Sequence, residues 1–304
     1  MTARFVDLGT SLARMLLQAA GIVVLVFVLC RVVPGDAVDR MALEGGLTTQ
    51  QESALRTEMG LDRTLAAQFV DWAGDAVRGD FGTSLRYQRP VSGMLATALP
   101  STLKLAVFSF AVGLALAIGL AVAATMTGSP WLSGLVNFVN VWSIALPTFC
   151  VGVIAILVFS IWLGWLPVLG GLLMPILIIG IDNAGQIGKP LFEELREAAT
   201  SAHVRTARAK GLGPLRIALL HLLPTALPVA LAMSGLVLAG LVAGTLTMEI
   251  LFGLPGLGSL MLNAIHGRDY PVVQAAITVA AVGLVVINAL IDIVHRAVDP
   301  RLAR

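Results

Sequence analysis

The feature that most constrains this chain is a series of apolar runs, each long enough to cross a bilayer as a helix. A spanning helix needs about 20 mostly apolar residues. Within lipid, only helices and closed barrels satisfy every backbone hydrogen bond. The chain is 57% hydrophobic and 12% charged, whereas soluble domains carry roughly 25% charged residues. We therefore expect an all-α polytopic membrane protein.

The runs predict six transmembrane helices, at about residues 12–33, 101–125, 135–163, 166–181, 215–247 and 272–294. The first ends at Pro34-Gly35-Asp36, a sequence that stops a helix. No small-residue cleavage site follows it, so we interpret it as a retained span rather than a signal peptide. Pro147 lies inside the third run, and Pro224 and Pro228 lie inside the fifth. We expect the fourth helix to continue past the apolar run as a polar helix through Glu197.

Three parts of the chain differ in composition. Residues 1–33 form the N-terminal segment and the first helix, and residues 101–304 form the core transmembrane domain. Residues 34–100 hold nine acidic residues and six arginines, which predicts a water-exposed insert of short helices. Inside this insert, Thr48 and Gln51 stand three residues apart and predict a capping box at a helix start.

The distribution of basic residues predicts the orientation. Six spans place both termini on the same side, and that side then holds Arg4, Arg14, Arg196, Arg205, Arg208, Lys210, Arg216, Arg296, Arg301 and Arg304. Basic residues in short loops stay in the cytoplasm. We expect a multi-pass protein of the inner (cytoplasmic) cell membrane, with both termini cytoplasmic and the insert at 34–100 extracytoplasmic.

The most informative segment is the basic, small-residue-rich stretch from His203 to Gly213. It is predicted to be helical up to Gly211, which can supply a left-handed cap. A short amphipathic helix between two spans is suited to dock on another protein or to lie on the lipid surface. The alternative is a solvated basic loop that only follows the positive-inside rule.

The sequence Val204-Arg205-Thr206-Ala207-Arg208-Ala209-Lys210-Gly211-Leu212 resembles the EAA-type loop of permeases of ABC importers, in the form found in B-type subunits of the peptide/nickel branch. Other stretches resemble the same branch in order and spacing. They lie at residues 31–36, 59–62, 79–84, 99–103, 255–258, 268–274 and 299–301. The chain departs from the family pattern at Pro224-Thr225, where the family has an Arg-Asn pair, and at Pro228.

The resemblance implies a type I ABC importer fold, with a coupling loop at residues 197–214 that docks on an ATPase subunit. By this resemblance the docking residues are Glu197, Arg205, Thr206, Ala207, Arg208, Lys210 and Gly211. It also implies the partners: a second, homologous permease in a heterodimer, two ATPase subunits and an extracytoplasmic solute-binding protein.

The sequence indicates no catalysis or cofactor in this chain. It contains no phosphate-binding GxxxxGK[ST] loop, so ATP and Mg are expected on the partner ATPase subunits. The four histidines are dispersed, and Cys30 and Cys150 lie in apolar runs, so we expect no metal site and no disulfide. The net charge of +2 indicates no nucleic-acid partner.

Polar residues inside predicted spans are candidates for the translocation path, because polar groups are costly in lipid. They are Asp182, Asn183, Gln186 and Glu249. The alternative is that they pair internally or mark the membrane exit. Small residues permit close helix approach, and in the fifth run these are Gly235, Gly240, Ala243 and Gly244.

The substrate stays open at this point. Short peptides are the first expectation, and nickel or a metal chelate or metallophore carried by the same machinery is the alternative. A different class, the ion-coupled secondary transporter, requires inverted repeats and coupling carboxylates at the midplane. No convincing repeat is present. A membrane-embedded enzyme is disfavoured because the HExxH and GxSxG motifs are absent.

Overall fold

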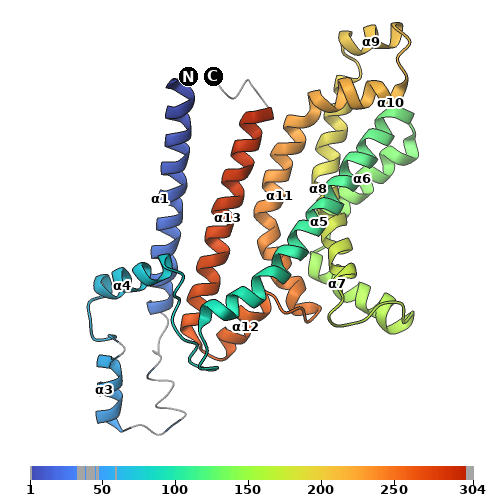
Figure 1. The fold of residues 1–304 in the computed structure, drawn as a ribbon. Helices are drawn as coiled ribbons and strands as arrows, with labels where there is room; N and C mark the ends of the chain where they lie inside the picture. Colours follow the sequence, from blue (N-terminus) through green and yellow to red (C-terminus); the bar gives the residue numbers. More distant parts are fainter. Residues whose placement is uncertain (1, 33–37, 39–44, 46–47, 59, 299–304) are drawn as a thin grey trace. The chain divides into compact units, whose positions relative to one another are not determined.

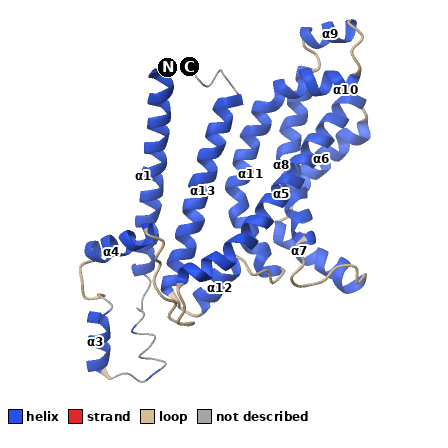
Figure 2. Ribbon diagram, viewed as in Figure 1, coloured by secondary structure: helices blue, strands red, loops and turns tan. Residues whose placement is uncertain are grey.

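The computed structural model describes residues 2–32, 38, 45, 48–58 and 60–298. Over these residues the regular elements are all helices, and one isolated β-bridge joins Thr83 and Pro90 (Figure 2). The expected all-α class is confirmed. The elements are α1 (Thr2–Val32), α3 (Thr49–Glu58), α4 (Leu65–Val77), α5 (Val91–Thr127), α6 (Pro130–Ala145), α7 (Thr148–Ala155), η1 (Ile156–Trp162), α8 (Leu173–Ala198), α9 (Ala202–Ala209), α10 (Pro214–Ile217), η2 (Ala218–Leu222), α11 (Leu223–Leu251), α12 (Leu257–His266) and α13 (Tyr270–Val298) (Figure 1).

Four helical stretches of the described chain are long and apolar enough to cross a membrane. They are Met15–Val32, Val91–Thr127, Pro214–Leu251 and Tyr270–Ile291, and a fifth results if α6 and α7–η1 together count as one span. The helix α8 has 26 residues, about 39 Å at 1.5 Å per residue, but it carries charged residues among its apolar ones. The count of six spans therefore stays a prediction.

The predicted third span is two helices rather than one. The axes of α6 and α7–η1 differ by 102°. The break lies at Leu146, which is extended (φ −114°, ψ 118°), and at Pro147, which follows it. A residue that precedes proline is pushed out of the helical region by the ring. The apolar pattern continues through this break, so hydropathy alone does not reveal it.

The described chain divides into two compact units. One comprises the residues up to Ser101 together with Pro255–Val285, and the other comprises Thr102–Leu254 together with the residues from Val286 onward. The first unit contains the insert. There the capping box at α3 is confirmed, because the Thr48 amide donates to Gln51 Oε1 at 2.9 Å and the Gln51 amide donates to Thr48 Oγ1 at 3.4 Å.

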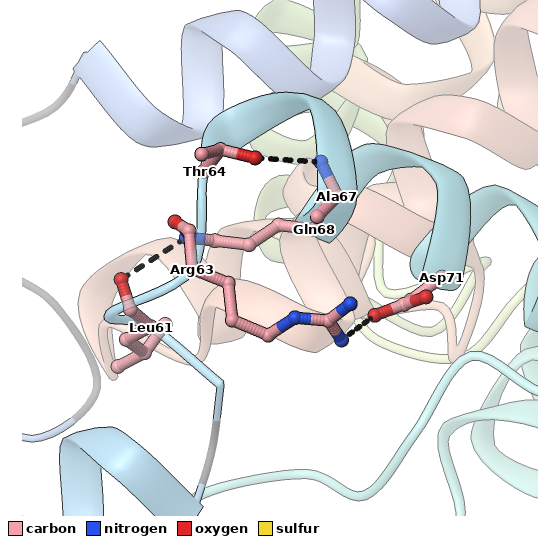
Figure 3. Close-up of polar contacts among 6 residues, drawn as sticks. All are labelled: Leu61, Arg63, Thr64, Ala67, Gln68 and Asp71. Atoms are coloured by element: carbon pink, nitrogen blue, oxygen red, sulfur yellow. Dashed lines mark hydrogen bonds and ion pairs between the residues drawn. The ribbon is translucent and has the colours of Figure 1, made fainter.

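The helix α4 is attached to α1 by aromatic packing. The ring of Phe27 lies 5.3 Å from that of Phe69 and 5.8 Å from that of Trp72. Polar contacts fix the start of α4 (Figure 3). The Thr64 hydroxyl accepts the amide of Ala67 at 3.3 Å, and the side chain of Gln68 donates to the carbonyl of Leu61 at 3.1 Å. An ion pair between Arg63 and Asp71 crosses the first turns.

The helix α5 begins at Val91 and continues through Pro100, so the predicted insert boundary at residue 100 lies inside this helix. The segment before it is held by Asp269, at the start of α13. This buried carboxylate accepts hydrogen bonds from Ser84 Oγ at 2.5 Å, from the Leu85 amide at 3.0 Å and from the Arg86 amide at 3.4 Å. No local sequence pattern indicates this long-range contact.

In the second unit, glycines bring α8 close to α5 and α6. A Cβ atom on Gly113 would lie 2.6 Å from the Cβ of Asn183, and one on Gly185 would lie 2.5 Å from the carbonyl oxygen of Val139. Neither position can hold a larger side chain without movement of the helices. By contrast, Gly240 and Gly244 have no described atom within 4 Å of a built Cβ. Gly235, from the same predicted set, is closer to a neighbour, since a Cβ there would lie 3.1 Å from Cγ2 of Ile291.

Candidate functional site

The helix α9 is joined to α8 by a tight turn that its hydroxyl side chains close. The Thr200 hydroxyl donates to the carbonyl of Glu197 at 2.8 Å, and the Ser201 hydroxyl donates to the carbonyl of Ala198 at 2.6 Å. The same two carbonyls also accept backbone amides, from Thr200 and from Ser201, each at 3.1 Å, so side-chain and backbone bonds together fix this turn. The predicted acidic residue Glu197 is exposed in the last turn of α8.

The other end of α9 is closed by a glycine cap. Gly211 has φ of +77°, a conformation that costs other residues a steric penalty. Its amide donates to the carbonyl of Arg208 at 2.9 Å, and the Leu212 amide donates to the carbonyl of Ala207 at 3.3 Å. This pair of bonds is a Schellman motif. The predicted left-handed cap at Gly211 is confirmed.

The two faces of α9 have different surroundings. Val204 and Ala207 are buried in a core cluster formed with α5, α6, α8, α10–η2 and α11. The opposite face is exposed and carries His203, Arg205, Thr206, Arg208 and Lys210. Ala207 was predicted among the docking residues, but its side chain is covered by this chain itself. It therefore anchors α9 rather than forming part of the exposed surface.

The exposed face of α9 is cationic. Within the described part of the chain, no ion pair involves Arg205, Arg208 or Lys210. Figure 1 shows α9 beyond the ends of α8 and α10, as a short helix at the margin of its unit. The geometry thus offers an unneutralised basic surface on a helix whose back is fixed in the core.

The polar residues predicted for the translocation path lie in different surroundings. On α8, Gln186 Nε2 donates to Asp182 Oδ2 at 3.0 Å. Asn183 is buried against Gly113 of α5. Glu249 is fully buried on α11. The structure therefore pairs Asp182 with Gln186, while Asn183 and Glu249 lie in helix packing. Lys189 forms an ion pair with Glu193 at 2.8 Å.

A cavity of about 430 Å³ lies among α6, α7, η1 and α8, and Asp182 forms part of its wall. The rest of its lining is mostly apolar and aromatic, with Trp142, Phe159 and Trp165 among the residues. Sequence reasoning missed these aromatic residues because aromatic residues in apolar runs also suit contact with lipid. The signal that could have indicated them is Pro147, since an interrupted span is typical of helices that line a cavity.

The arrangement defines a class of protein. Over its described residues the chain is helical, several of its helices are long and apolar enough to cross a membrane, and α9 presents a basic face between α8 and α10. Residues 113–304 match the family model described as "Binding-protein-dependent transport system inner membrane component". The chain belongs to this family. Membership implies a translocation component that works with binding-protein and ATPase partners.

Curated relatives match along nearly the whole chain. A Brucella abortus (strain 2308) protein, provisionally named a peptide transport system permease, is 30% identical over 294 residues, covering 92% of this chain and 93% of its own. The glutathione transport system permease protein GsiC of Escherichia coli (strain K12) is 31% identical over 284 residues, covering 92% of each chain.

Proposed function

We propose that this chain is the permease subunit of an ATP-driven importer that moves short peptides from an extracytoplasmic solute-binding protein into the cytoplasm. The relatives named above transport peptides or glutathione by their printed names, which favours peptides over nickel or a metal chelate. Membership in a binding-protein-dependent family favours this machinery over an ion-coupled secondary transporter. The observation that carries the proposal is α9, which is cationic on one face and fixed in the core on the other.

The docking surface in this proposal comprises the exposed residues Glu197, Arg205, Thr206, Arg208 and Lys210, with Gly211 ending the helix. The basic side chains contact an acidic groove of an ATPase subunit, where charge complementarity orients the two proteins. ATP and Mg bind to the ATPase subunits, and this chain binds no cofactor. The complete transporter contains this chain, a second homologous permease, two ATPase subunits and the binding protein.

The buried face of α9 makes it a lever. Val204 and Ala207 are buried in one core cluster with residues of α5, α6, α8, α10–η2 and α11. When the ATPase subunits close on ATP, α9 moves with them, and the packed helices follow because a close-packed core transmits displacement. Alternating access then results from movement between discrete packed states.

This mechanism requires a protein of the inner membrane. Both of its termini and α9 lie in the cytoplasm, and the insert at 34–100 lies outside. The inside position is supported by the basic residues that the six-span arrangement collects on one side. A cysteine introduced at Thr48 would react with an impermeant maleimide from outside, and one at Ser201 only after permeabilisation. The reverse pattern would overturn this orientation.

Arg208→Glu tests the docking surface. The reversed charge faces the same groove and repels it, so we expect ATPase subunits to co-purify at least about tenfold less well, which corresponds to 1.4 kcal/mol. ATP-driven uptake of trialanine in proteoliposomes is lost in parallel. The control is Arg78→Glu, an equal charge change at an exposed residue of the insert. Normal co-purification and uptake with Arg208→Glu would reject the docking role.

A further inference from the structure

The cavity beside α8 has one ionisable residue, Asp182, among its described lining residues. Among its described lining residues Asp182 alone carries a charge, and no Lys, Arg or His contributes to the lining. The hydrogen bond from Gln186 supplies one donor to the carboxylate but no opposite charge. A carboxylate in apolar surroundings is costly unless a cation or several donors meet it. The electrostatics of this cavity therefore favour a ligand with a positively charged group.

Aromatic side chains give a second, independent indication. Trp142, Phe159 and Trp165 contribute to the lining, and the rings of Phe159 and Trp165 lie 6.0 Å apart. The faces of aromatic rings attract ammonium groups, most strongly when water is excluded. Carboxylate and aromatic rings together are suited to an organic ammonium group and exclude a free anion.

The volume of the cavity and its position at the Pro147 break are both typical of a ligand-binding site. A volume of about 430 Å³ lies within the range of roughly 300–1,000 Å³ found for small-molecule sites. Residues on both sides of this break line the cavity, where the axes of α6 and α7–η1 differ by 102°.

We propose that this cavity binds the amino-terminal end of a short peptide during transport, with the α-ammonium group paired to the carboxylate of Asp182 and the first side chains against the aromatic wall. The inference rests on the proposed function, because it specifies how that same permease holds its substrate. The carboxyl-terminal end of the peptide points out of the cavity, since the lining offers it no cation.

A protection experiment tests this binding in the assembly of both permeases and both ATPase subunits, reconstituted in lipid nanodiscs without binding protein. Cys30 and Cys150 are replaced by serine, and Thr148→Cys places a thiol on the cavity wall. The rate of maleimide labelling is measured with and without millimolar trialanine. We expect trialanine to slow labelling, and Asp182→Asn to raise the concentration needed for half protection about tenfold or more, because a charge-assisted contact is lost.

Two variants and two peptides separate charge from shape. Asp182→Glu keeps the charge and should retain protection. Glu193→Gln removes a carboxylate from the same helix outside the cavity and should protect like the parent. Trialanine amide, which keeps the ammonium group, should protect, whereas N-acetyl-trialanine should not. These peptide comparisons are made without binding protein, so that its own selectivity does not enter.

The outcomes distinguish the two proposals. ATP-driven uptake of trialanine by the unmodified transporter, with its binding protein, is measured in parallel in proteoliposomes. If uptake occurs but protection is absent, needs the same trialanine concentration with Asp182→Asn, or is equal for N-acetyl-trialanine, the cavity does not bind the ammonium end and the peptide-importer proposal stands. If the transporter takes up no peptide, both proposals fail.

Discussion

The contact between Asp269 and residues 84–86 allows a perturbation whose size follows from the geometry. The side chain of Asp269 is 0% exposed, and its two oxygens divide the donors between them. Oδ1 accepts from the Leu85 amide, and Oδ2 accepts from Ser84 Oγ and the Arg86 amide. In Asp269→Asn one oxygen becomes an NH₂ group, which cannot accept. Either the Leu85 bond or the other two bonds must be lost.

The expected cost is large for a change of one atom. A hydrogen bond to a charged group contributes roughly 1.5–3 kcal/mol, and a buried donor left unpaired costs a further 1–3 kcal/mol. Allowing for partial relaxation, we expect the closed form of the segment around residues 82–90 to lose about 2–4 kcal/mol. At a factor of ten per 1.4 kcal/mol, local opening becomes about 30 to 700 times more frequent.

Hydrogen exchange of the peptide covering residues 82–90 measures this opening directly, because the Leu85 and Arg86 amides are themselves the donors. Asp80→Asn is the matched control, since Asp80 is an exposed carboxylate of the same segment that accepts the Gly82 amide at 2.9 Å. Its effect on exchange should be below about fivefold, because exposed donors rebind water. Equal exchange in Asp269→Asn and the parent would refute the reasoning.

Further predictions concern single positions. Gly185→Ala should destabilise the chain by about 1–3 kcal/mol, because the new Cβ meets the carbonyl oxygen of Val139. Gly240→Ala should stabilise it by about 0.5–1 kcal/mol, because the site is open and alanine favours the helix. Melting temperatures of the two variants that shift in the same direction would contradict this. Gly211→Ala should lower the stability of the end of α9 by about 1–2 kcal/mol, because alanine is strained at φ of +77°. Hydrogen exchange in α9 should become faster, and unchanged exchange would argue against strain at this cap. Thr48→Ala should cost α3 about 1 kcal/mol, and equal exchange in that helix would argue against the capping box.

The sequence predicted correctly where the determinants lie within a few residues of each other. Thr48 and Gln51 satisfy each other across one turn, and Gly211 alone permits the backbone that ends α9. The helical class followed from the apolar runs because lipid leaves the backbone few alternatives. Which residues of α9 are exposed could be determined only from the structure, since the burial of Ala207 depends on helices distant in sequence.

Pairing among polar residues of α8 was harder to anticipate. Asp182 and Lys189 share one helical face by their spacing, but each finds a partner one turn away, Asp182 in Gln186 and Lys189 in Glu193. Neighbours at i,i+4 are closer than those at i,i+7. The contact of Asp269 with Ser84 joins positions far apart in sequence, and no local pattern indicates such a pair.

The helix α8 links the two sites that the proposals assign. Asp182 lies on the cavity wall, and the turn that begins α9 follows Ala198, about 24 Å away along one continuous helix. The glycines Gly180 and Gly185 leave no space between α8 and its neighbours α5 and α6. Because α8 is packed this closely against α5 and α6, it cannot slide alone when α9 is displaced. A displacement of α9 should therefore move α5, α6 and α8 together, so the cavity changes its access through movement of a packed block rather than through rotation of a single side chain.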